Sequence, residues 1–130
     1  MSTQPQPSAL RVLAVDDDEI NLDIVQELLA QVGVTDVHLA ASGLLGLKSL
    51  RTLHNVDYVV LDIYMPDMDG IEFIAALAEL GYTGALIIVS GVNIETLELT
   101  RQLAQASGIR VAAALEKPVQ GAALARAMGL

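Results

Sequence analysis

Short apolar runs alternate with amphipathic helical segments along almost the whole chain, and this alternation restricts the fold more than any other feature. Five runs predict buried strands, at residues 11–15, 37–40, 58–61, 86–89 and 111–115. A helical segment follows each run. Strands that alternate with helices pair in parallel through right-handed crossovers. The sequence therefore predicts an α/β fold with helices on both faces of a parallel sheet.

Capping residues and glycines predict the ends of the helices. The first helix is expected to begin near Glu19 and to stop at Gly33. Its expected apolar stripe consists of Ile20, Ile24, Val25, Leu28, Leu29 and Val32. Ser42 and Asn93 are expected to cap the second and fourth helices, and Gly70 and Val119 are expected to begin the third and fifth. The predicted ends of the second, third and fourth helices are Leu53, Leu80-Gly81 and Ser107-Gly108.

The length of 130 residues suits a single domain. Residues 1–9 are mostly polar and contain Pro5 and Pro7, so they predict a flexible N-terminal tail. Residues 10–130 then form the domain. Hydrophobic residues make up 53% of the chain but aromatic residues only 3%, so the core is expected to be aliphatic, as in strands buried on both faces.

The charge and the composition exclude several classes of function. A formal net charge of −9 repels nucleic-acid backbones and anionic lipid surfaces, so neither is expected as a direct partner. The chain has no cysteine, which rules out disulfides, thiolate metal sites and cysteine nucleophiles. No apolar stretch reaches the roughly 18 residues of a membrane span, and no signal segment opens the chain. A cytoplasmic location is expected.

Acidic residues follow two of the predicted strands. Asp16, Asp17 and Asp18 come after the first strand, and Asp62 follows the third. The carboxyl ends of parallel strands meet at one edge of a sheet, where open α/β folds bind their ligands. At roughly 5 Å and an effective dielectric constant of about 20, each pair of carboxylates repels by about 3 kcal/mol. Mg²⁺, which prefers oxygen ligands, is the natural counter-ion.

Each motif also has a purely structural interpretation when it is taken alone. The aspartates after the first strand could only cap a helix, and residues 66–70 form a turn before the third helix. Lys117-Pro118 could be an exposed lysine before a turn, and Ser90-Gly91 is equally ordinary. The combination of all four motifs at strand ends is much more specific than any one of them.

These motifs, in this order, resemble the receiver domain of the bacterial response-regulator family from about Leu10 to the end of the chain. The resemblance implies a flavodoxin-like, doubly wound (βα)5 fold with the strand order 2-1-3-4-5. It also implies that Asp62 accepts a phosphoryl group from the phosphohistidine of a sensor histidine kinase or phosphotransfer protein. Such a domain catalyses only its own phosphorylation and dephosphorylation and is not otherwise an enzyme.

The resemblance assigns roles to the other motif residues. Asp17 and Asp62 would ligate Mg²⁺ directly, Asp16 would act through water, and Tyr64 would contribute its backbone carbonyl. Lys117 would pair with Asp62 and then with the phosphoryl group, and Ser90 would donate its hydroxyl to that group. Gly91 would keep the approach to the site open. In receivers the bond that matches Lys117-Pro118 is commonly cis.

Two positions depart from the family pattern. Ala114 stands in the fifth strand where receivers usually carry the aromatic ring that moves on phosphorylation. We therefore expect the signal to pass from Ser90 through the fourth strand to the apolar residues of the fourth helix, Leu97, Leu99 and Leu103. Val92 replaces a polar residue near the attacking water, which predicts slow hydrolysis of the phosphorylated form.

Several alternatives stay open at the level of sequence. The chain is either the receiver part of a larger regulator, with a loose similarity around residues 108–119 to receivers joined to cyclic-di-GMP phosphodiesterase domains, or a stand-alone shuttle. The fourth and fifth helices also offer a homodimer face. Outside this family, a haloacid-dehalogenase-like phosphatase would use Asp16 as its nucleophile, and a receiver-like binding module would never take phosphate.

Overall fold

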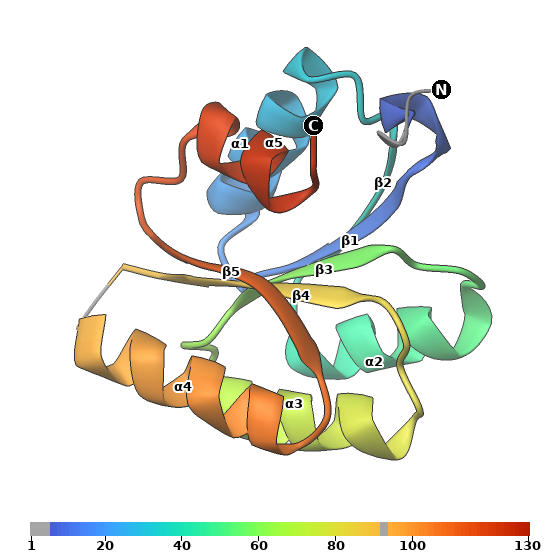
Figure 1. Cartoon of the computed structure of the whole chain (residues 1–130). Helices are drawn as coiled ribbons and strands as arrows, with labels where there is room; N and C mark the ends of the chain where they lie inside the picture. The colour runs from blue at the N-terminus through green and yellow to red at the C-terminus, as the bar shows by residue number, and fades with distance from the viewer. Residues whose placement is uncertain (1–5, 92–93) are drawn as a thin grey trace.

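The computed structural model describes residues 6–91 and 94–130. Five parallel strands form one sheet in the order β2-β1-β3-β4-β5, which confirms the predicted fold (Figure 1). The strands are β1 (Arg11–Val15), β2 (Asp36–Ala40), β3 (Tyr58–Asp62), β4 (Ala85–Ser90) and β5 (Arg110–Glu116). The helices are α1 (Glu19–Gln31), α2 (Gly43–Thr52), α3 (Gly70–Glu79), α4 (Ile94–Ala106) and α5 (Gly121–Ala127).

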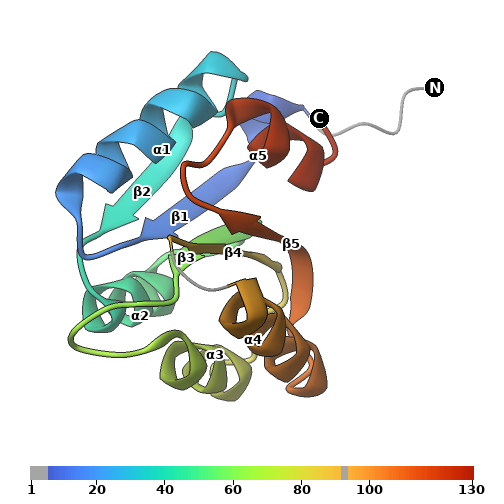
Figure 2. The ribbon, with the colours of Figure 1, turned by 90° about the vertical axis from the view of Figure 1, so that its left-hand side faces the viewer.

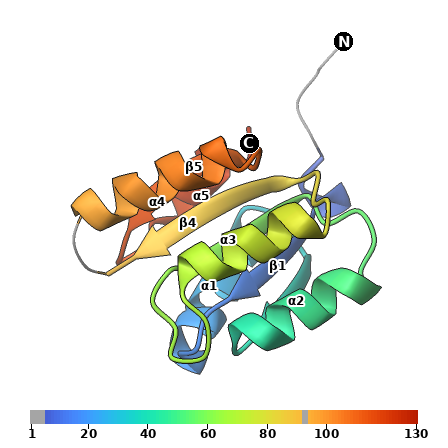
Figure 3. The ribbon, with the colours of Figure 1, turned by 90° about the horizontal axis from the view of Figure 1, so that it is seen from below.

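The helices cover the two faces of the sheet unequally. Helices α1 and α5 lie on one face, and α2, α3 and α4 lie side by side on the other (Figures 2 and 3). Each face has its own apolar core, the first built on Leu29 and Leu124 and the second on Phe73 and Leu97. Strands β1, β3 and β4 are almost completely buried between these layers. Burial on both faces explains why their sequences are continuous aliphatic runs.

The apolar stripe predicted for α1 is only partly correct. Val25 and Leu29 are buried, but Ile20 and Ile24 are 70% and 48% exposed. Leu22, which the prediction omitted, is buried instead. The buried residues of the helix, Leu22, Val25 and Leu29, are spaced three and four apart, so the helix meets the sheet through a face that leaves Ile20 largely in solvent.

One predicted helix boundary also differs from the structure. Helix α5 begins at Gly121 rather than at Val119, because the chain stays extended through its cap residue Gln120. The expected tail at residues 1–9 ends in a short 3-10 helix, Pro7–Ala9, whose Pro7 lies against Gly33. The predicted cap at Asn93, and Val92 before it, lie outside the described residues.

Within the described part of the chain, no helix combines the length and the apolar composition needed to cross a membrane.

Candidate functional site

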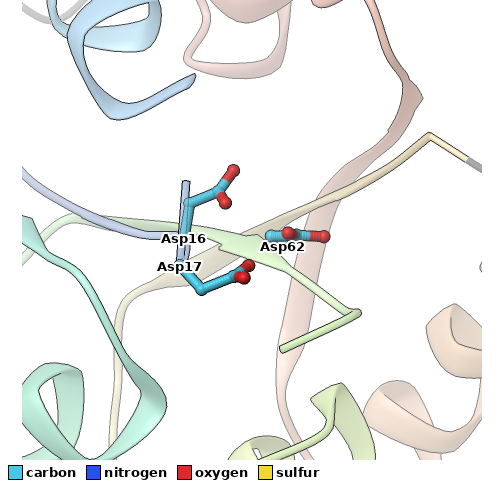
Figure 4. Close-up of side chains that lie close together, drawn as sticks. All are labelled: Asp16, Asp17 and Asp62. Carbon is cyan, nitrogen blue, oxygen red and sulfur yellow. The ribbon is translucent and has the colours of Figure 1, made fainter. Parts of the chain in front are cut away.

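The carboxyl ends of β1 and β3 bring three aspartates together. Asp16 follows β1 directly, and its amide donates to the carbonyl of Ala40 at 3.1 Å, so the strand geometry continues through it. Asp62 is the last residue of β3, which pairs with β1 in parallel. One carboxylate oxygen from each of Asp16, Asp17 and Asp62 lies within 4.8 Å of the other two (Figure 4). Asp16 and Asp62 are buried, whereas Asp17 is exposed.

Lys117 supplies a positive charge to the same cluster. Its Nζ lies 3.3 Å from Oδ2 of Asp16 and 3.4 Å from Oδ2 of Asp62. The lysine is held there by its backbone, because its amide donates to the carbonyl of Ser90 at 2.8 Å. The Lys117-Pro118 peptide bond is cis, as the resemblance implied. The ammonium therefore bridges the two buried carboxylates.

Local hydrogen bonds orient the acidic side chains. The amide of Asp18 donates to Oδ1 of Asp16 at 2.9 Å, and the amide of Tyr64 donates to Oδ1 of Asp62 at 3.1 Å. Asp18 itself caps α1 by accepting from the amide of Ile20 at 2.9 Å. The three consecutive aspartates thus have different positions: Asp18 caps α1, whereas Asp16 and Asp17 belong to the acidic cluster.

Burial and charge shift the protonation equilibria in the cluster. The pKa of Asp62 is raised to about 6, chiefly because burial removes solvent and also because of the charge of Asp16, while the Tyr64 amide and Lys117 act in the opposite direction. Burial by itself lowers the pKa of Lys117, but the charges of Asp62 and Asp16 together outweigh it, so that pKa lies above its ordinary value. Lys117 therefore stays positive at neutral pH.

The donor set fits a hard divalent cation. Three carboxylate oxygens within 4.8 Å of one another match the oxygen coordination that Mg²⁺ prefers. Poor solvation destabilises the charged form of Asp62 and raises its pKa, so a cation nearby would stabilise that charged form. Asp17 is exposed and remains open to a ligand. The side chain of Tyr64 is 49% exposed, while its backbone adjoins Asp62.

The expected switch residues lie close to this cluster. Ser90 ends β4 and is fully buried. Gly91 follows it, and a Cβ atom there would lie 3.5 Å from Cδ of Lys117, an ordinary contact, so sterics alone do not demand glycine. Ala114 pairs with Ile88 in the adjacent strand and lines a pocket of about 280 Å³ between β5 and α4. The small side chain of Ala114 thus forms part of the wall of a pocket beside α4.

Two features of the site were not predicted from the sequence. A pocket of about 320 Å³ opens beside Asp62 and Lys117, with apolar walls from Ile24 and Val25 of α1. Asp67, which lies in the turn expected at residues 66–70, accepts two hydrogen bonds from α2. No local sequence pattern marks either feature, because each depends on how α1 or α2 packs beside the loops.

Comparison with known proteins identifies the family. The family model for the response regulator receiver domain matches residues 12–128. The two-component response regulator ORR23 of Oryza sativa subsp. indica is 41% identical over 70 residues, which is 52% of this chain and 10% of that protein. The matches cover only 18% and 10% of the first two curated relatives, so this chain is much shorter than they are.

Solved structures show the same fold. A response regulator receiver domain protein from Clostridium thermocellum has a TM-score of 0.79 at 24% identity and covers 92% of this chain and 90% of its own. A response regulator from Colwellia psychrerythraea has a TM-score of 0.73 at 30% identity, covering 88% and 90%. Neither the family match nor the likeness to these structures supports the alternative of a haloacid-dehalogenase-like phosphatase. The strand order, the clustered strand-end carboxylates and the family match together show that this chain belongs to the response regulator receiver domains.

Proposed function

We propose that this chain is a phosphoacceptor of two-component signalling and that Asp62 takes the phosphoryl group in a Mg²⁺-dependent reaction. The observation that carries this proposal is the position of Asp62, a buried carboxylate with two further aspartates and Lys117 around it. Family membership supports it independently. The donor is a phosphohistidine on a sensor histidine kinase or a phosphotransfer protein.

The chemistry is a single displacement at phosphorus. An oxygen of Asp62 forms the new P–O bond while the N–P bond of the phosphohistidine breaks, and the imidazole keeps the electron pair of that bond. Carboxylates are weak nucleophiles, so orientation and charge neutralisation must supply the catalysis. The Tyr64 amide fixes Asp62, and the ammonium of Lys117 is placed to offset charge on the phosphoryl oxygens.

The residues available to hold Mg²⁺ are Asp17 and Asp62 directly, Asp16 through water, and the backbone carbonyl of Tyr64. When bound, the ion neutralises charge between the carboxylates and the incoming phosphoryl oxygens. Asp62 pairs with Lys117 through only one of its oxygens, Oδ2, while its Oδ1 accepts from the Tyr64 amide. Asp17 is exposed and keeps a carboxylate directed at the cluster.

Phosphorylation is expected to change the surface formed by α4, β5 and α5. Ser90 lies at the end of β4 and would donate its hydroxyl to the phosphoryl group, a bond worth roughly 1.5–3 kcal/mol. Helix α4 follows soon after Gly91 in the chain and carries exposed Leu99 and Leu103. Ala114 lines a pocket between β5 and α4, and this pocket is where a shift of the helix would be accommodated. The exposed leucines then present a changed surface to an output domain, a target protein or a second copy.

Acetyl phosphate with Mg²⁺ and mass spectrometry tests the proposal. Wild-type protein should gain a stable phosphoryl group at Asp62, and Asp62→Asn should gain none. Lys117→Ala should keep some label but lose the conformational response, and Asp17→Ala should need more Mg²⁺. Equal labelling of Asp62→Asn and wild type would remove Asp62 from the mechanism. Steady turnover through Asp16 would indicate a phosphatase, and no label on wild type would indicate a binding module.

The output arrangement is a separate proposal. The matched relatives are longer than this chain, which supports the arrangement of a receiver within a larger regulator. A cyclic-di-GMP phosphodiesterase domain is one candidate for its output domain. A stand-alone shuttle is the other arrangement. An immunoblot of native cells with an antibody against this chain separates the two, since a band near 13.7 kDa indicates the shuttle and a heavier band indicates the larger regulator.

A further inference from the structure

The loop between β3 and α3 is tied to helix α2 by one carboxylate. Asp67 accepts from the amide of Gly43 through Oδ1 at 3.2 Å and from the amide of Leu44 through Oδ2 at 3.1 Å. These two amides belong to the first turn of α2, where the helix has no internal acceptor for them. Ser42, the local cap, accepts from Leu45 instead. Asp67 therefore accepts hydrogen bonds from free amides at the start of a helix that lies more than 20 residues before it in the chain.

Side-chain packing reinforces this tie. A Cβ atom built on Gly43 would lie 2.8 Å from Cβ of Met68, so the residue after Asp67 lies directly against the helix backbone. A real Cβ atom does not approach another carbon so closely, and any larger residue at Gly43 would push the loop away. The contact between the loop and α2 is thus both polar and steric.

The same loop is fixed at its other end beside the acid cluster. The Tyr64 amide donates to Oδ1 of Asp62 at 3.1 Å, and the amide of Gly70 donates to the carbonyl of Ile63 at 3.1 Å. Tyr64 therefore sits in a short segment that is held by Asp62 on one side and by Asp67 on the other. The amide of Ile63 also donates to the carbonyl of Val89 in β4 at 3.3 Å, so the loop is held by β4 near its start and by α2 through Asp67 near its end.

We propose that Asp67 is a positioning residue for the metal site: by fixing the loop to α2, it holds the Tyr64 backbone beside Asp62 in the conformation that binds Mg²⁺. This inference rests on the proposed function. A carboxylate that accepts two amides at a helix N-terminus is favoured by charge and by the helix dipole. Without it, Mg²⁺ binding must also order the loop, which weakens the affinity.

Matched variants of the full chain separate positioning from loss of charge. Asp67→Ala removes the tie. Asp69→Ala is the control, because it removes the same charge from the same loop but breaks only the cap of α3 at Glu72. Asp67→Asn keeps one acceptor oxygen and loses the charge. Gly43→Ala disturbs the contact from the helix side and leaves Asp67 intact.

Two measurements are made on each variant. Isothermal titration calorimetry with Mg²⁺ should show about tenfold weaker binding for Asp67→Ala, an intermediate loss for Asp67→Asn, and a change within about twofold for Asp69→Ala. Amide hydrogen exchange by NMR in the absence of metal should become faster at Gly43, Leu44 and Tyr64 in Asp67→Ala. Gly43→Ala should weaken Mg²⁺ binding in the same direction.

The dependence of labelling on Mg²⁺ distinguishes positioning from a general loss of structure. With acetyl phosphate, Asp67→Ala should need about tenfold more Mg²⁺ for its half-maximal rate and should reach the wild-type maximum. Faster exchange at Gly43 with unchanged Mg²⁺ affinity would overturn the inference, as would equal weakening in Asp67→Ala and Asp69→Ala. If wild-type protein binds no Mg²⁺, the proposed function falls, and the inference falls with it. If wild-type protein binds Mg²⁺ but Asp67→Ala and Asp69→Ala weaken that binding equally, the proposed function stands and only this inference falls.

Discussion

At the scale of single residues, Asp62 experiences the strongest conflict between burial and charge. It is 6% exposed, its Oδ2 lies 3.4 Å from Lys117, and Asp16 adds a second negative charge nearby. A pKa of about 6 means that folding makes ionisation of this carboxyl less favourable than in the unfolded chain. Such a residue is well suited to bind a cation, which offsets the charge that burial makes unfavourable.

This conflict predicts a pH-dependent effect of Asp62→Asn on stability without metal. Since the folded-state pKa is raised from 3.8 to about 6, the native protein loses stability as pH rises through that range. The asparagine variant avoids this loss, so it should be about 2 kcal/mol more stable than wild type at pH 7.5 and no more stable at pH 4. Urea denaturation at the two pH values, with EDTA present, measures the difference. Asp23→Asn, on the exposed side of α1, is the control and should show no such gap.

At the scale of the elements, helix α2 approaches the sheet closely at Gly46. A Cβ atom there would lie 2.8 Å from Cγ2 of Val15 and 3.1 Å from the ring of Phe73. The absence of a side chain therefore sets the distance between α2 and the sheet. Gly43, in the preceding turn of the helix, has the same role against Met68.

Gly46→Ala should consequently destabilise the protein although alanine favours helices. The added methyl group must displace Val15 or Phe73, an overpacking strain of about 1–3 kcal/mol. Gly121→Ala, at the start of α5, is the matched control because its nearest neighbour would be Leu28 at an ordinary 3.5 Å. Thermal unfolding by circular dichroism measures both variants. A Gly46→Ala protein as stable as Gly121→Ala would contradict the packing argument.

Helix α4 has a buried face and an exposed face with separate expected roles. Leu97 is buried at 3% exposure, whereas Leu99 is 55% exposed. Leu97→Ala should cost about 2–5 kcal/mol of unfolding free energy because it leaves a cavity in the core. Leu99→Ala should change it by less than about 0.5 kcal/mol. Chemical denaturation of the two variants checks this contrast, and equal losses would mean that α4 packs differently.

At the scale of the whole molecule, the proposed metal site predicts that Mg²⁺ binding and folding are coupled. An ion that binds only the native state stabilises it by about 2.7 kcal/mol at a concentration one hundred times its dissociation constant. The acid cluster forms only when β1 and β3 are paired, so the unfolded chain cannot bind Mg²⁺ in the same way. Thermal stability should therefore rise with Mg²⁺ in wild type and much less in Asp17→Ala. If the midpoint of thermal unfolding of wild-type protein does not change with Mg²⁺, this result would contradict the proposed metal site.

The response to phosphorylation should also extend beyond the site. Beryllofluoride mimics the phosphoryl group, and NMR shifts between the free and bound protein should include Ser90 and continue into α4. This path is expected because Ser90 ends β4, α4 follows it, and Ala114 has no ring to move. Asp62→Asn should show none of these shifts. Changes that avoid α4 altogether would require a different route to the output surface.

Much of the fold could be predicted because its signals are local. Apolar runs and capping residues gave the five strands and most helix boundaries, and parallel pairing placed Asp16 and Asp62 at one edge. The errors have local causes too. Ile20 looks like a core residue by periodicity, but it is 70% exposed, and Leu22 is the buried residue of the first turns of α1. Val119 looks like a helix start, but the chain remains extended to Gln120.

The sequence by itself determined at which strand ends the acidic residues and Lys117 lie. Alternation fixes the order of the elements, and the ends of strands in a parallel sheet share one edge. Only the tertiary structure decided the contacts between distant segments. Lys117 reaches Asp16 across 101 residues, and Asp67 reaches Gly43 across 24. Such contacts depend on the packing of whole helices against the sheet, and no short stretch of sequence encodes that distance.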